Sequence, residues 1–467
     1  MLRFTNTLSG EIEEFVPLDD NRVRIYVCGP TVWDFAHIGN FRTFTFADVL
    51  QRYLRYKGYD VTYVMNLTDV DDRIINEAAK KCITIDEMTA PFIVAFNEDM
   101  AALGNQFPDV QPRATEHIPE MIDIIQKLLA NGKAYESDGS IYFRIAEFPA
   151  YGNLAKINFE GNIEGGSERV DTDKYDKEDA RDFALWKLVE DGTATGWDAP
   201  FGRGRPGWHM ECSAMSMKYC GETFDIHAGG ADLKFPHHEN EIAQSEGSTG
   251  KLFSKYWLHG EFLKIDNDTM SKSLGNAHTL RDVMDQGFSA LAIRYMLISA
   301  PYKKQLNFTF EGLKGAETTV ARLRQFRRLV AESNGDEGSF NSVASTVSDA
   351  VAAFEAAMDD DLNTARALAA IHDLVSEINI VLADGNLRKD DRDAVLNAVD
   401  GFNSVLGIFG EPESDEILDE EIEKLIEERQ QARANRDFAR SDEIRDELAG
   451  KGIVLEDTKD GVRWKRG

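Results

Sequence analysis

Thiols are scarce in this chain. Its 467 residues include four cysteines, Cys28, Cys82, Cys212 and Cys220, and no two of them form a Cys-x-x-Cys pair. So few cysteines at such irregular spacing argue against a disulfide framework of the kind that holds small secreted domains together. Metal binding, or burial as small apolar side chains, remains open for them.

Long apolar runs are also missing. No stretch approaches the roughly 18 apolar residues that span a bilayer, and residues 1–6 lack the apolar segment and small-residue cleavage site of a secretory signal. With 36 glycines and 12 prolines, collagen-like and wholly disordered chains are excluded as well. We therefore expect a cytoplasmic protein of several folded domains, without a membrane partner.

Basic residues are outnumbered. There are 52 Lys and Arg against 82 Asp and Glu, and the formal net charge is −30. This balance disfavours a nucleic-acid partner unless cations gather locally, because phosphate binding needs basic patches. Residues 413–428 hold nine acids and one lysine, whereas residues 429–467 hold ten Lys or Arg and eight Asp or Glu. The contrast indicates a separate terminal domain, although a solvated helical face is the simpler alternative.

What the sequence does contain is an alternation of strand and helix patterns. Residues 23–28 alternate as a strand does, residues 44–56 carry apolar side chains at helical spacing, and residues 61–66 form a second β-rich run. Strand, helix and strand at this spacing make a βαβ unit, and such units build parallel sheets. Short apolar strands return at 224–227 and 256–259, after a stretch rich in Gly, Asp and Pro. The predicted fold class is α/β, with a parallel sheet and an inserted subdomain.

Further along, the pattern becomes helical. Three apolar stripes at helical spacing follow one another, at residues 343–358, 368–381 and 395–406. Asn363 or Thr364 would cap the second of these helices. We expect a bundle of helices that a linker joins to the terminal domain.

One segment combines several metal-binding side chains. His237 lies four residues before Glu241, so these two side chains share a helical face. His238 lies three residues before Glu241 and is a competing partner that spacing alone does not exclude. Cys28 ends the first strand and Cys212 enters a predicted helix, and parallel strands present their carboxyl ends to one crevice. A metal site is one interpretation, and buried cysteines beside solvent-facing histidines are the other.

Two further segments suit a bound nucleotide. His37, Gly39 and Asn40 lie between the first strand and its helix, where a helix N-terminus offers free N–H groups to phosphate. His37 can donate a hydrogen bond, and Gly39 leaves room for a base or ribose. Residues 268–276 form a hydroxyl-rich loop whose Lys272 could close over a triphosphate. Each segment alone equally fits a surface turn.

Taken together, the motifs resemble the cysteinyl-tRNA synthetase family of class I aminoacyl-tRNA synthetases. They are Tyr-Val-Cys-Gly-Pro-Thr-Val at 26–32, His-Ile-Gly-Asn at 37–40, Gly-Trp-His-Met-Glu-Cys-Ser-Ala-Met at 207–215, Phe-Pro-His-His-Glu-Asn-Glu-Ile-Ala-Gln at 235–244 and Met-Ser-Lys-Ser-Leu-Gly-Asn at 270–276. The similarity runs from residues 4–8 to residues 452–457.

For the fold, the resemblance implies a catalytic domain of Rossmann type followed by helices, in a monomer. The expected parts are the Rossmann-type catalytic domain at 1–114 and 207–265, a connective insertion at 115–206, a stem-contact region at 266–315, an α-helical bundle at 316–410 and a small anticodon-binding domain at 411–467.

Carried over position by position, the resemblance also implies site residues. The ligands of one zinc ion would be Cys28, Cys212, His237 and Glu241, which selects His237 over His238. ATP binding and catalysis would fall to His37, Gly39, Asn40 and Lys272. The pocket for the substrate cysteine would involve Trp208, His227 and Asp232. The anticodon contacts would be Arg433, Phe438, Asp442 and Asp457.

The terminal segment has features of its own that suit RNA. Arg433, Arg436 and Arg440 are three and four residues apart, so we expect them on one helical face, where a phosphate backbone could lie. Phe438 offers a ring for an unstacked anticodon base. The expected partner is tRNA(Cys).

Two positions depart from the family pattern. Position 40 is Asn where the first signature usually ends in His, and position 269 is Thr where the second usually begins with Lys. Asn40 can still donate a hydrogen bond but carries no charge, and Lys272 remains. We expect weaker ATP binding in a site that is still active.

The implied reaction has two steps. The carboxylate of L-cysteine attacks the α-phosphate of ATP, bound with Mg²⁺, to give cysteinyl-adenylate and pyrophosphate, and the 3′ end of tRNA(Cys) then takes the acyl group. Zinc would recognise the substrate thiolate, because it prefers soft sulfur ligands to a hydroxyl.

Three alternatives remain. The first is a cysteine:amino-sugar ligase of the mycothiol pathway, which would lack the terminal domain. The second is a non-catalytic tRNA-binding paralogue. The third is a zinc hydrolase, which would need an open metal position and a general base.

Overall fold

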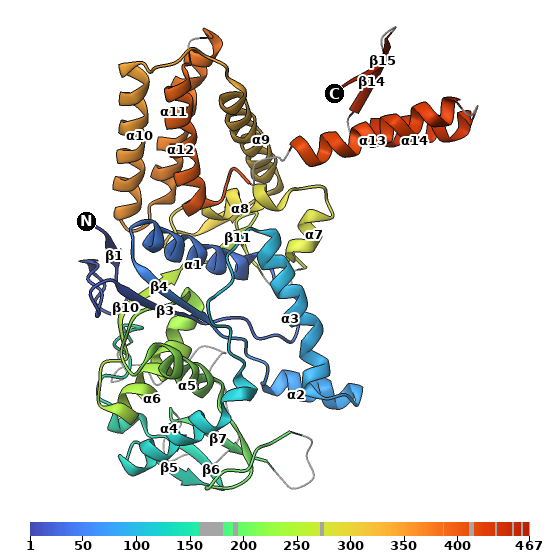
Figure 1. Cartoon of the computed structure of the whole chain (residues 1–467). Helices are drawn as coiled ribbons and strands as arrows, with labels where there is room; N and C mark the ends of the chain where they lie inside the picture. The colour runs from blue at the N-terminus through green and yellow to red at the C-terminus, as the bar shows by residue number, and fades with distance from the viewer. Residues whose placement is uncertain are drawn as a thin grey trace. The chain divides into compact units, whose positions relative to one another are not determined.

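The chain folds as two units, Met1–Gly410 and Glu411–Gly467 (Figure 1). The computed structural model describes residues 1–157, 181–189, 195–270, 275–385, 387–410, 415–434, 437–450, 453–458 and 461–466. Among the helices in these ranges, none is both long enough and apolar enough to cross a membrane.

A four-stranded parallel sheet lies at the centre of the first unit. Its strands are β3 (Arg22–Val27), β4 (Asp60–Met65), β9 (Phe224–Gly230) and β10 (Ser254–Gly260), in the order β10-β9-β3-β4. The register pairs Val27 with Met65 of β4 and with Ala228 of β9, and Leu258 of β10 with Ala228. These are the four strands that the apolar runs predict, so the α/β fold class with a parallel sheet is confirmed.

Successive side chains of β3 point to two different cores. Val23, Ile25 and Val27 join the larger core, together with α1 (Ile38–Tyr56) and the helices that follow residue 310. Tyr26, and Cys28 just beyond the strand, join a second core on the opposite face. Three helices cover that second face: α4 (Ile118–Ala130), α5 (Trp208–Cys220) and α6 (Glu239–Thr249). The sheet is therefore buried on both faces, as parallel sheets require.

Helix α1 begins six residues before the start that apolar spacing predicts. His37 is its N-cap, with extended backbone, and the His37 and Asn40 side chains each accept the backbone N–H of the other. This reciprocal capping starts the helix at Ile38, ahead of its apolar stripe. Two helices that no pattern above predicts, α2 (Asp72–Lys81) and α3 (Ile85–Ala102), follow β4.

An antiparallel sheet separates the two halves of the parallel one along the sequence. Its order is β5 (Ala134–Ser137), β6 (Ser140–Phe143), β7 (Phe183–Leu188) and β8 (Gly204–Pro206). Smaller elements complete this unit: β1 (Arg3–Thr5), β2 (Ile12–Glu14), β11 (Leu263–Ile265), β12 (Asp268–Thr269), β13 (Leu306–Phe308), α7 (Leu280–Met284) and α8 (Ala290–Ile298).

Four helices end the first unit: α9 (Phe310–Glu332), α10 (Asn341–Asp359), α11 (Thr364–Ala383) and α12 (Lys389–Leu406). The last three contain the three predicted apolar stripes. Of the two candidate caps for α11, Asn363 is the N-cap, and its side chain accepts the backbone N–H of Arg366. Buried side chains of these helices pack in the same core as α1.

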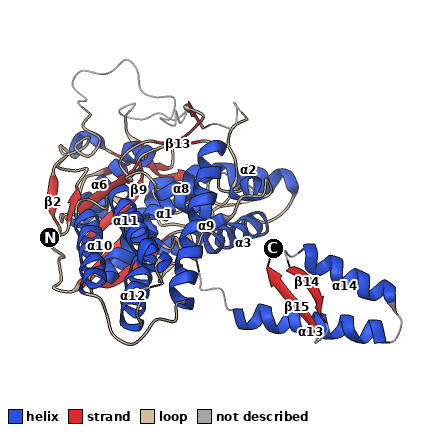
Figure 2. Ribbon diagram, turned by 90° about the horizontal axis from the view of Figure 1, so that it is seen from above, coloured by secondary structure: helices blue, strands red, loops and turns tan. Residues whose placement is uncertain are grey.

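The second unit consists of α13 (Asp415–Ala434), α14 (Phe438–Gly450) and an antiparallel hairpin of β14 (Ile453–Thr458) and β15 (Gly461–Arg466) (Figure 2). Ile426, Ile444 and Leu448 form its core. The predicted single face with Arg433 and Arg440 is wrong, because α13 ends at Ala434 and a new helix starts at Phe438. Asp437 caps that helix by accepting the backbone N–H of Arg440. Arg436 lies outside the described residues.

Candidate active site and metal centre

The four expected metal ligands meet at the carboxyl edge of the parallel sheet. Cys28 directly follows β3, Cys212 lies on α5, His237 belongs to the helical turn Lys234–His238, and Glu241 lies on α6. All four side chains are buried. Each offers a ligand atom, and the four atoms lie within 4.8 Å of one another. Edges of this kind are where doubly wound folds bind ligands.

The separations match those of a tetrahedral ion. With Zn–S bonds of about 2.3 Å and Zn–O bonds of about 2.0 Å, two sulfurs lie about 3.8 Å apart and a sulfur and an oxygen about 3.5 Å apart. Cys28 Sγ is 3.7 Å from Cys212 Sγ and 3.5 Å from Glu241 Oε1. His237 Nε2 is 3.0 Å from Glu241 Oε1. The donor set of two sulfurs, one nitrogen and one oxygen therefore fits zinc.

A second donor set shares two of these residues. Cys28, His227, His238 and Glu241 also bring their ligand atoms within 4.8 Å. In this set, however, His227 Nε2 is only 2.8 Å from Glu241 Oε2, and so it holds the carboxylate oxygen that faces away from Cys28. His227 thus orients Glu241, whose other oxygen lies 3.5 Å from Cys28 Sγ, as outer partners of metal ligands do.

His237 has an orienting partner of the same kind. His209 lies on α5, the helix that carries Cys212. Its Nδ1 is 2.8 Å from His237 Nδ1, which leaves His237 Nε2 facing Glu241. By contrast, His238 Nδ1 is 2.8 Å from His259 Nε2, and its own Nε2 is 3.9 Å from Glu241 Oε1. Geometry therefore favours His237 as the nitrogen donor.

Negative charge collects at this centre. Burial raises the pKa of the Cys28 thiol well above its ordinary value, and its hydrogen bond to Cys212 adds to the rise. Burial also acts to raise the pKa of Cys212, but that hydrogen bond and the nearby His237 outweigh it and lower the pKa to about 6. For Glu241, burial is outweighed by His227 and His237, and the pKa falls to about 2.

The imidazole of His237 responds in the opposite direction. Burial disfavours its charged form, yet the adjacent Glu241 and Cys212 raise its pKa to about 10. A thiolate and a carboxylate are thus held side by side in a buried space, with a proton on His237 as the compensating charge. A divalent cation bound by the same atoms would take the place of that proton.

Three residues were expected around the substrate cysteine. Trp208, the first residue of α5, has its ring 4.3 Å from that of His237 and is 40% exposed, so it borders the metal donors on their open side. His227 is fully buried behind Glu241, where it stacks on Trp257 at 4.4 Å. Asp232 is exposed on the turn Ala231–Leu233 that follows β9.

The expected ATP residues lie at the start of α1. His37 is its N-cap and Asn40 its third residue, so both lie beside the free N–H groups of the helix. A side-chain carbon placed on Gly39 would lie 3.4 Å from Met270 Cε, which puts the beginning of the Met-Ser-Lys-Ser motif against the first signature. The chain after that motif returns to the same place, since Ile38 donates its backbone N–H to His278 O. Lys272 lies outside the described residues.

Several neighbours of the site were not predicted. Asn66, directly after β4, accepts the backbone N–H of Gly29 at 2.9 Å and lies 3.8 Å from Cys212 Sγ. The sequence could have indicated Asn66, because it directly follows a predicted parallel strand, as Cys28 does, and the carboxyl ends of such strands meet at one crevice. Glu239, on α6, accepts the backbone N–H groups of Gly152 and Ala155. A loop of the insertion is therefore held against the helix that also carries Glu241. No sequence pattern indicates that contact.

In the second unit, the expected RNA contacts are spread over several elements. Arg433 lies exposed near the end of α13, and Asp442 lies exposed on α14, where it pairs with Arg445 at 3.2 Å. Phe438 begins α14 and Asp457 lies on β14. Arg440 is engaged by Glu428 and Glu443.

The parallel sheet and the motifs at its edge define a class I aminoacyl-tRNA synthetase. Residues 14–318 match the family model described as the class I (C) tRNA synthetase catalytic domain, residues 353–410 match the DALR domain, and residues 415–464 match the cysteinyl-tRNA ligase anticodon binding domain. The fold is also similar to that of Mycobacterium tuberculosis methionyl-tRNA synthetase in complex with methionyl-adenylate, with a TM-score of 0.60 at 15% identity over 83% of this chain and 89% of that one.

Proteins with similar sequences show which family of class I synthetases the chain belongs to. The cysteine–tRNA ligase of Solibacter usitatus is 50% identical over 466 residues, which cover 100% of this chain and 99% of the relative. That of Koribacter versatilis is 47% identical over 495 residues, with 100% and 99% covered. The chain therefore belongs to the cysteine–tRNA ligase family, whose members are also called cysteinyl-tRNA synthetases.

Proposed function

We propose that this chain activates L-cysteine with ATP and transfers it to the 3′ end of tRNA(Cys). The observation that carries the proposal is the buried set of Cys28, Cys212, His237 and Glu241, placed at the sheet edge that also holds the N-terminus of α1. A centre rich in sulfur beside a phosphate-binding helix end suits a substrate that carries a thiol and reacts with a nucleotide.

These four residues would hold Zn²⁺, which when bound supplies a Lewis acid that favours the thiolate of cysteine over the hydroxyl of serine. Two neighbouring histidines hold these ligands in place. His227 and His209 fix the ligand atoms of Glu241 and His237. Trp208 would cover the substrate side chain from the open side, and Asp232 would bind its amino group. Discrimination at the thiol needs no separate editing site.

For the phosphates, His37, Gly39 and Asn40 would provide the cradle. The free N–H groups at the start of α1 favour negative charge, and Gly39 allows close approach. Lys272 would stabilise the charge that develops on pyrophosphate, from the Met-Ser-Lys-Ser motif, whose first residue, Met270, lies against Gly39. The nucleotide would enter as its Mg²⁺ complex.

Each segment of the chain would have its own role in the two-step reaction. Residues 1–114 and 207–265 would carry activation, residues 115–206 the connective insertion, and residues 266–315 and 316–410 the contacts with the tRNA stem and body. Residues 411–467 would read the anticodon, with Arg433, Phe438, Asp442 and Asp457 in contact with it. The protein would act as a monomer in the cytoplasm, where tRNA is charged.

ATP–pyrophosphate exchange with cysteine and with serine tests the activation step. We expect strong preference for cysteine and about one zinc per chain by elemental analysis. Cys212→Ser should lose both zinc and cysteine-dependent exchange, because it removes one of the two sulfurs.

His238→Asn is the matched variant, since His238 belongs to the competing donor set alone. It should keep its zinc. Loss of zinc in His238→Asn but not in Cys212→Ser would select the other set, and undiminished exchange in a zinc-free Cys212→Ser protein would contradict the recognition role of the metal.

A further inference from the structure

Arg281, on the short helix α7, is bound by three groups of helix α3. Its Nε donates to Asp99 Oδ1 at 2.9 Å, and its Nη2 donates to Glu98 Oε2 at 2.7 Å and to Ala95 O at 3.3 Å. Asp99 is buried, so the contact is partly shielded from solvent. Two nitrogens of one planar guanidinium hold two carboxylates, which fixes the orientation of this side chain more closely than a lysine ammonium would.

The same guanidinium lies over an aromatic ring in front of α1. Its Cζ is 5.7 Å from the centre of the Phe35 ring, a distance at which a cation and an aromatic face attract each other. Phe35 belongs to residues 33–37, the end of the first signature loop, and lies two residues before His37. The ring of Phe92, on α3, meets it at 5.3 Å. Arg281 therefore joins α7 and α3 to the chain that leads into the proposed ATP residues.

Helix α7 is also tied to the start of α1. Ile38 donates its backbone N–H to His278 O at 2.9 Å, and His37 pairs with Thr279 as an isolated antiparallel bridge. Thr279 is the N-cap of α7, through a reciprocal capping box. His37 is thus held between α7 on one side and residues 33–36 on the other. Arg281 belongs to the first of these segments and contacts the second.

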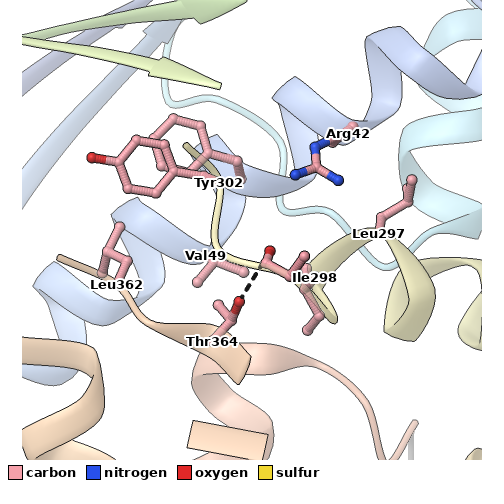
Figure 3. Close-up of a pocket in the computed structure, with 9 residues that line it drawn as sticks. Arg42, Val49, Leu297, Ile298, Tyr302, Leu362 and Thr364 are labelled. Carbon is pink, nitrogen blue, oxygen red and sulfur yellow. Dashed lines mark hydrogen bonds between the residues drawn. The ribbon is translucent and has the colours of Figure 1, made fainter. Parts of the chain in front are cut away.

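Helix α1 has an anchor of its own. Arg42, its fifth residue, is buried, and its Nη2 donates to the backbone oxygens of Pro301 and Lys304. Figure 3 shows this side chain between α1 and the end of α8, where Leu297 and Ile298 lie. The contacts of α7 and α3 therefore fix the chain ahead of α1, and not α1 itself.

The part of the loop that carries Cys28 is held separately as well. Val32 donates its backbone N–H to Thr68 O at 3.0 Å, and Thr68 donates its own to Pro30 O at 3.0 Å. These bonds attach residues 30–32 to the chain that follows β4. A change at α7 should therefore leave the proposed zinc ligand in place.

We propose that Arg281 is a positioning residue for ATP, which holds His37 in place by fixing α7 on one side and residues 33–36 on the other. The proposal rests on the ATP site proposed above, but not on the identity of the amino acid or of the tRNA. Without Arg281 the cradle for the phosphates would be looser, and a displacement of about 1 Å in such a group can cost about a hundredfold in rate.

A simpler role for Arg281 would be that of a counter-ion to Asp99. Burial raises the pKa of the Asp99 carboxyl, and the hydrogen bond from Arg281 works against that rise. If Arg281 did nothing more, its removal would destabilise the fold through an unpaired carboxylate, and removing the carboxylate as well would repair the protein completely. The two roles therefore differ in what a second substitution restores.

Calorimetric binding of MgATP in the absence of cysteine tests the proposal independently of the amino acid. Arg281→Met should weaken ATP binding by about tenfold and slow cysteine-dependent pyrophosphate exchange by about ten- to a hundredfold. The KM for cysteine and the zinc content should not change. Adding Asp99→Asn should restore the Tm that Arg281→Met lowers, but not the affinity for ATP. Recovery of both, or an equal loss in cysteine binding and zinc, would overturn the positioning role.

Arg73→Met is the matched control. Arg73, on α2, pairs with Asp71 at 2.9 Å and lies 5.0 Å from the ring of Trp33, at the other end of residues 33–37. It offers that segment the same chemistry but does not belong to α7, so Arg73→Met should bind ATP as the natural protein does. An equal loss in both variants, or no loss in Arg281→Met, would refute the proposal.

Two milder variants keep the test decisive if Arg281→Met does not fold. Phe35→Leu removes only the ring, and Arg281→Lys keeps the charge without the fork of two nitrogens. Each should weaken ATP binding without a change in the KM for cysteine, and normal ATP affinity in both would refute the proposal. ATP binding that depends on Arg281, in a protein without cysteine-dependent exchange, would contradict the proposed reaction and still support this role.

Discussion

At the scale of single residues, the observed capping role of Asn40 can be separated from its proposed role in ATP binding. Its side chain accepts the backbone N–H of His37 at 3.1 Å, while His37 Nδ1 accepts the backbone N–H of Asn40 at 3.2 Å. The position therefore both caps α1 and faces the proposed triphosphate. The usual His of the family would offer a cation here; this chain offers an amide, which keeps the cap.

Asn40→Ala should lower the free energy of unfolding by about 1 kcal/mol, as the loss of a capping side chain does, and should also raise the KM for ATP. Asn40→Asp retains an acceptor for the cap and adds a negative charge next to the phosphates. We expect it to unfold like the natural protein but to bind ATP more weakly than Asn40→Ala does. Urea denaturation and pyrophosphate exchange measure the two effects. Equal KM values for all three proteins would remove Asn40 from the ATP site.

The proposed metal ligands show how much of a site can be predicted from residue patterns alone. Spacing and strand ends indicated Cys28, Cys212 and Glu241 as candidate donors and left plain burial of the two cysteines as the alternative. They also left His237 and His238 as rivals, because both lie one helical turn from Glu241, and the family resemblance alone selected His237. The choice depends on the second nitrogen of each ring, held by His209 in one case and by His259 in the other. Partners so distant in sequence have no periodic signature.

At the scale of elements, the parallel strands β3 and β4 end so close together that only glycine fits directly after Cys28. A side-chain carbon on Gly29 would lie 1.7 Å from the backbone oxygen of Asn66, far inside contact distance. Gly29→Ala must therefore displace one of the two strand ends. Because Cys28 is a proposed zinc ligand and Asn66 lies 3.8 Å from Cys212 Sγ, we expect loss of zinc and of cysteine activation.

Gly315→Ala is the control for that substitution. Gly315 lies within α9, and nothing lies within 4 Å of an added side-chain carbon. Alanine favours a helix over glycine by roughly 1 kcal/mol, so this variant should be as stable as the natural protein or more so, with full zinc content. Metal analysis and Tm measure both variants. A Gly29→Ala protein with normal zinc would mean that the strand ends yield without disturbing the centre.

A buried ion pair joins three elements of the larger core. Arg294 on α8 contacts Asp48 on α1 at 2.6 Å and donates to Leu406 O at the end of α12. Both charged side chains are fully buried. Arg294→Met leaves Asp48 charged and less well compensated, since Arg52, at 2.8 Å, is then its one remaining ion-pair partner among the described residues.

We expect Arg294→Met to lower the free energy of unfolding by about 3 kcal/mol, the low end of the usual cost of removing one partner of a buried ion pair, because Arg52 still contacts Asp48. The double variant Arg294→Met with Asp48→Leu should recover part of that loss, because the buried carboxylate is gone, while Arg52 at the edge of the core loses its partner. Urea midpoints for the single and double variants measure the difference. A double variant less stable than Arg294→Met would show that the pair adds stability beyond mutual neutralisation.

Element boundaries were predictable only where apolar spacing alone sets them. The three helices α10, α11 and α12 lie where their stripes predict. The start of α1 and the break between α13 and α14 escaped prediction, because polar caps decide both. His37 and Asn40 start α1 ahead of its apolar stripe. Asp437 caps α14 inside the segment that the spacing of Arg433 and Arg440 predicts as one helix.

At the scale of the whole molecule, the chain carries its large negative charge unevenly. Residues 413–428 are strongly acidic, whereas residues 429–467 carry more basic than acidic side chains. These segments form a unit with a core of its own, built on Ile426, Ile444 and Leu448. Overall net charge therefore says little about the RNA partner, because binding depends on the local potential.

The boundary at Gly410 allows these parts to be separated. Gly410 O accepts hydrogen bonds from Asn403 and Arg327, so the end of the first unit is held within that unit. A chain that ends at Gly410 keeps the metal donors, the α1 capping pair and the larger core. We expect its cysteine-dependent pyrophosphate exchange to stay close to that of the full chain. Charging of tRNA(Cys) should fall by more than about tenfold in kcat/KM, since the proposed anticodon contacts are gone. A minihelix that lacks the anticodon is the control, and both proteins should charge it equally. If the shortened chain charged tRNA(Cys) at full efficiency, the anticodon role of residues 411–467 would be wrong, and a small acceptor such as an amino sugar would become the better candidate.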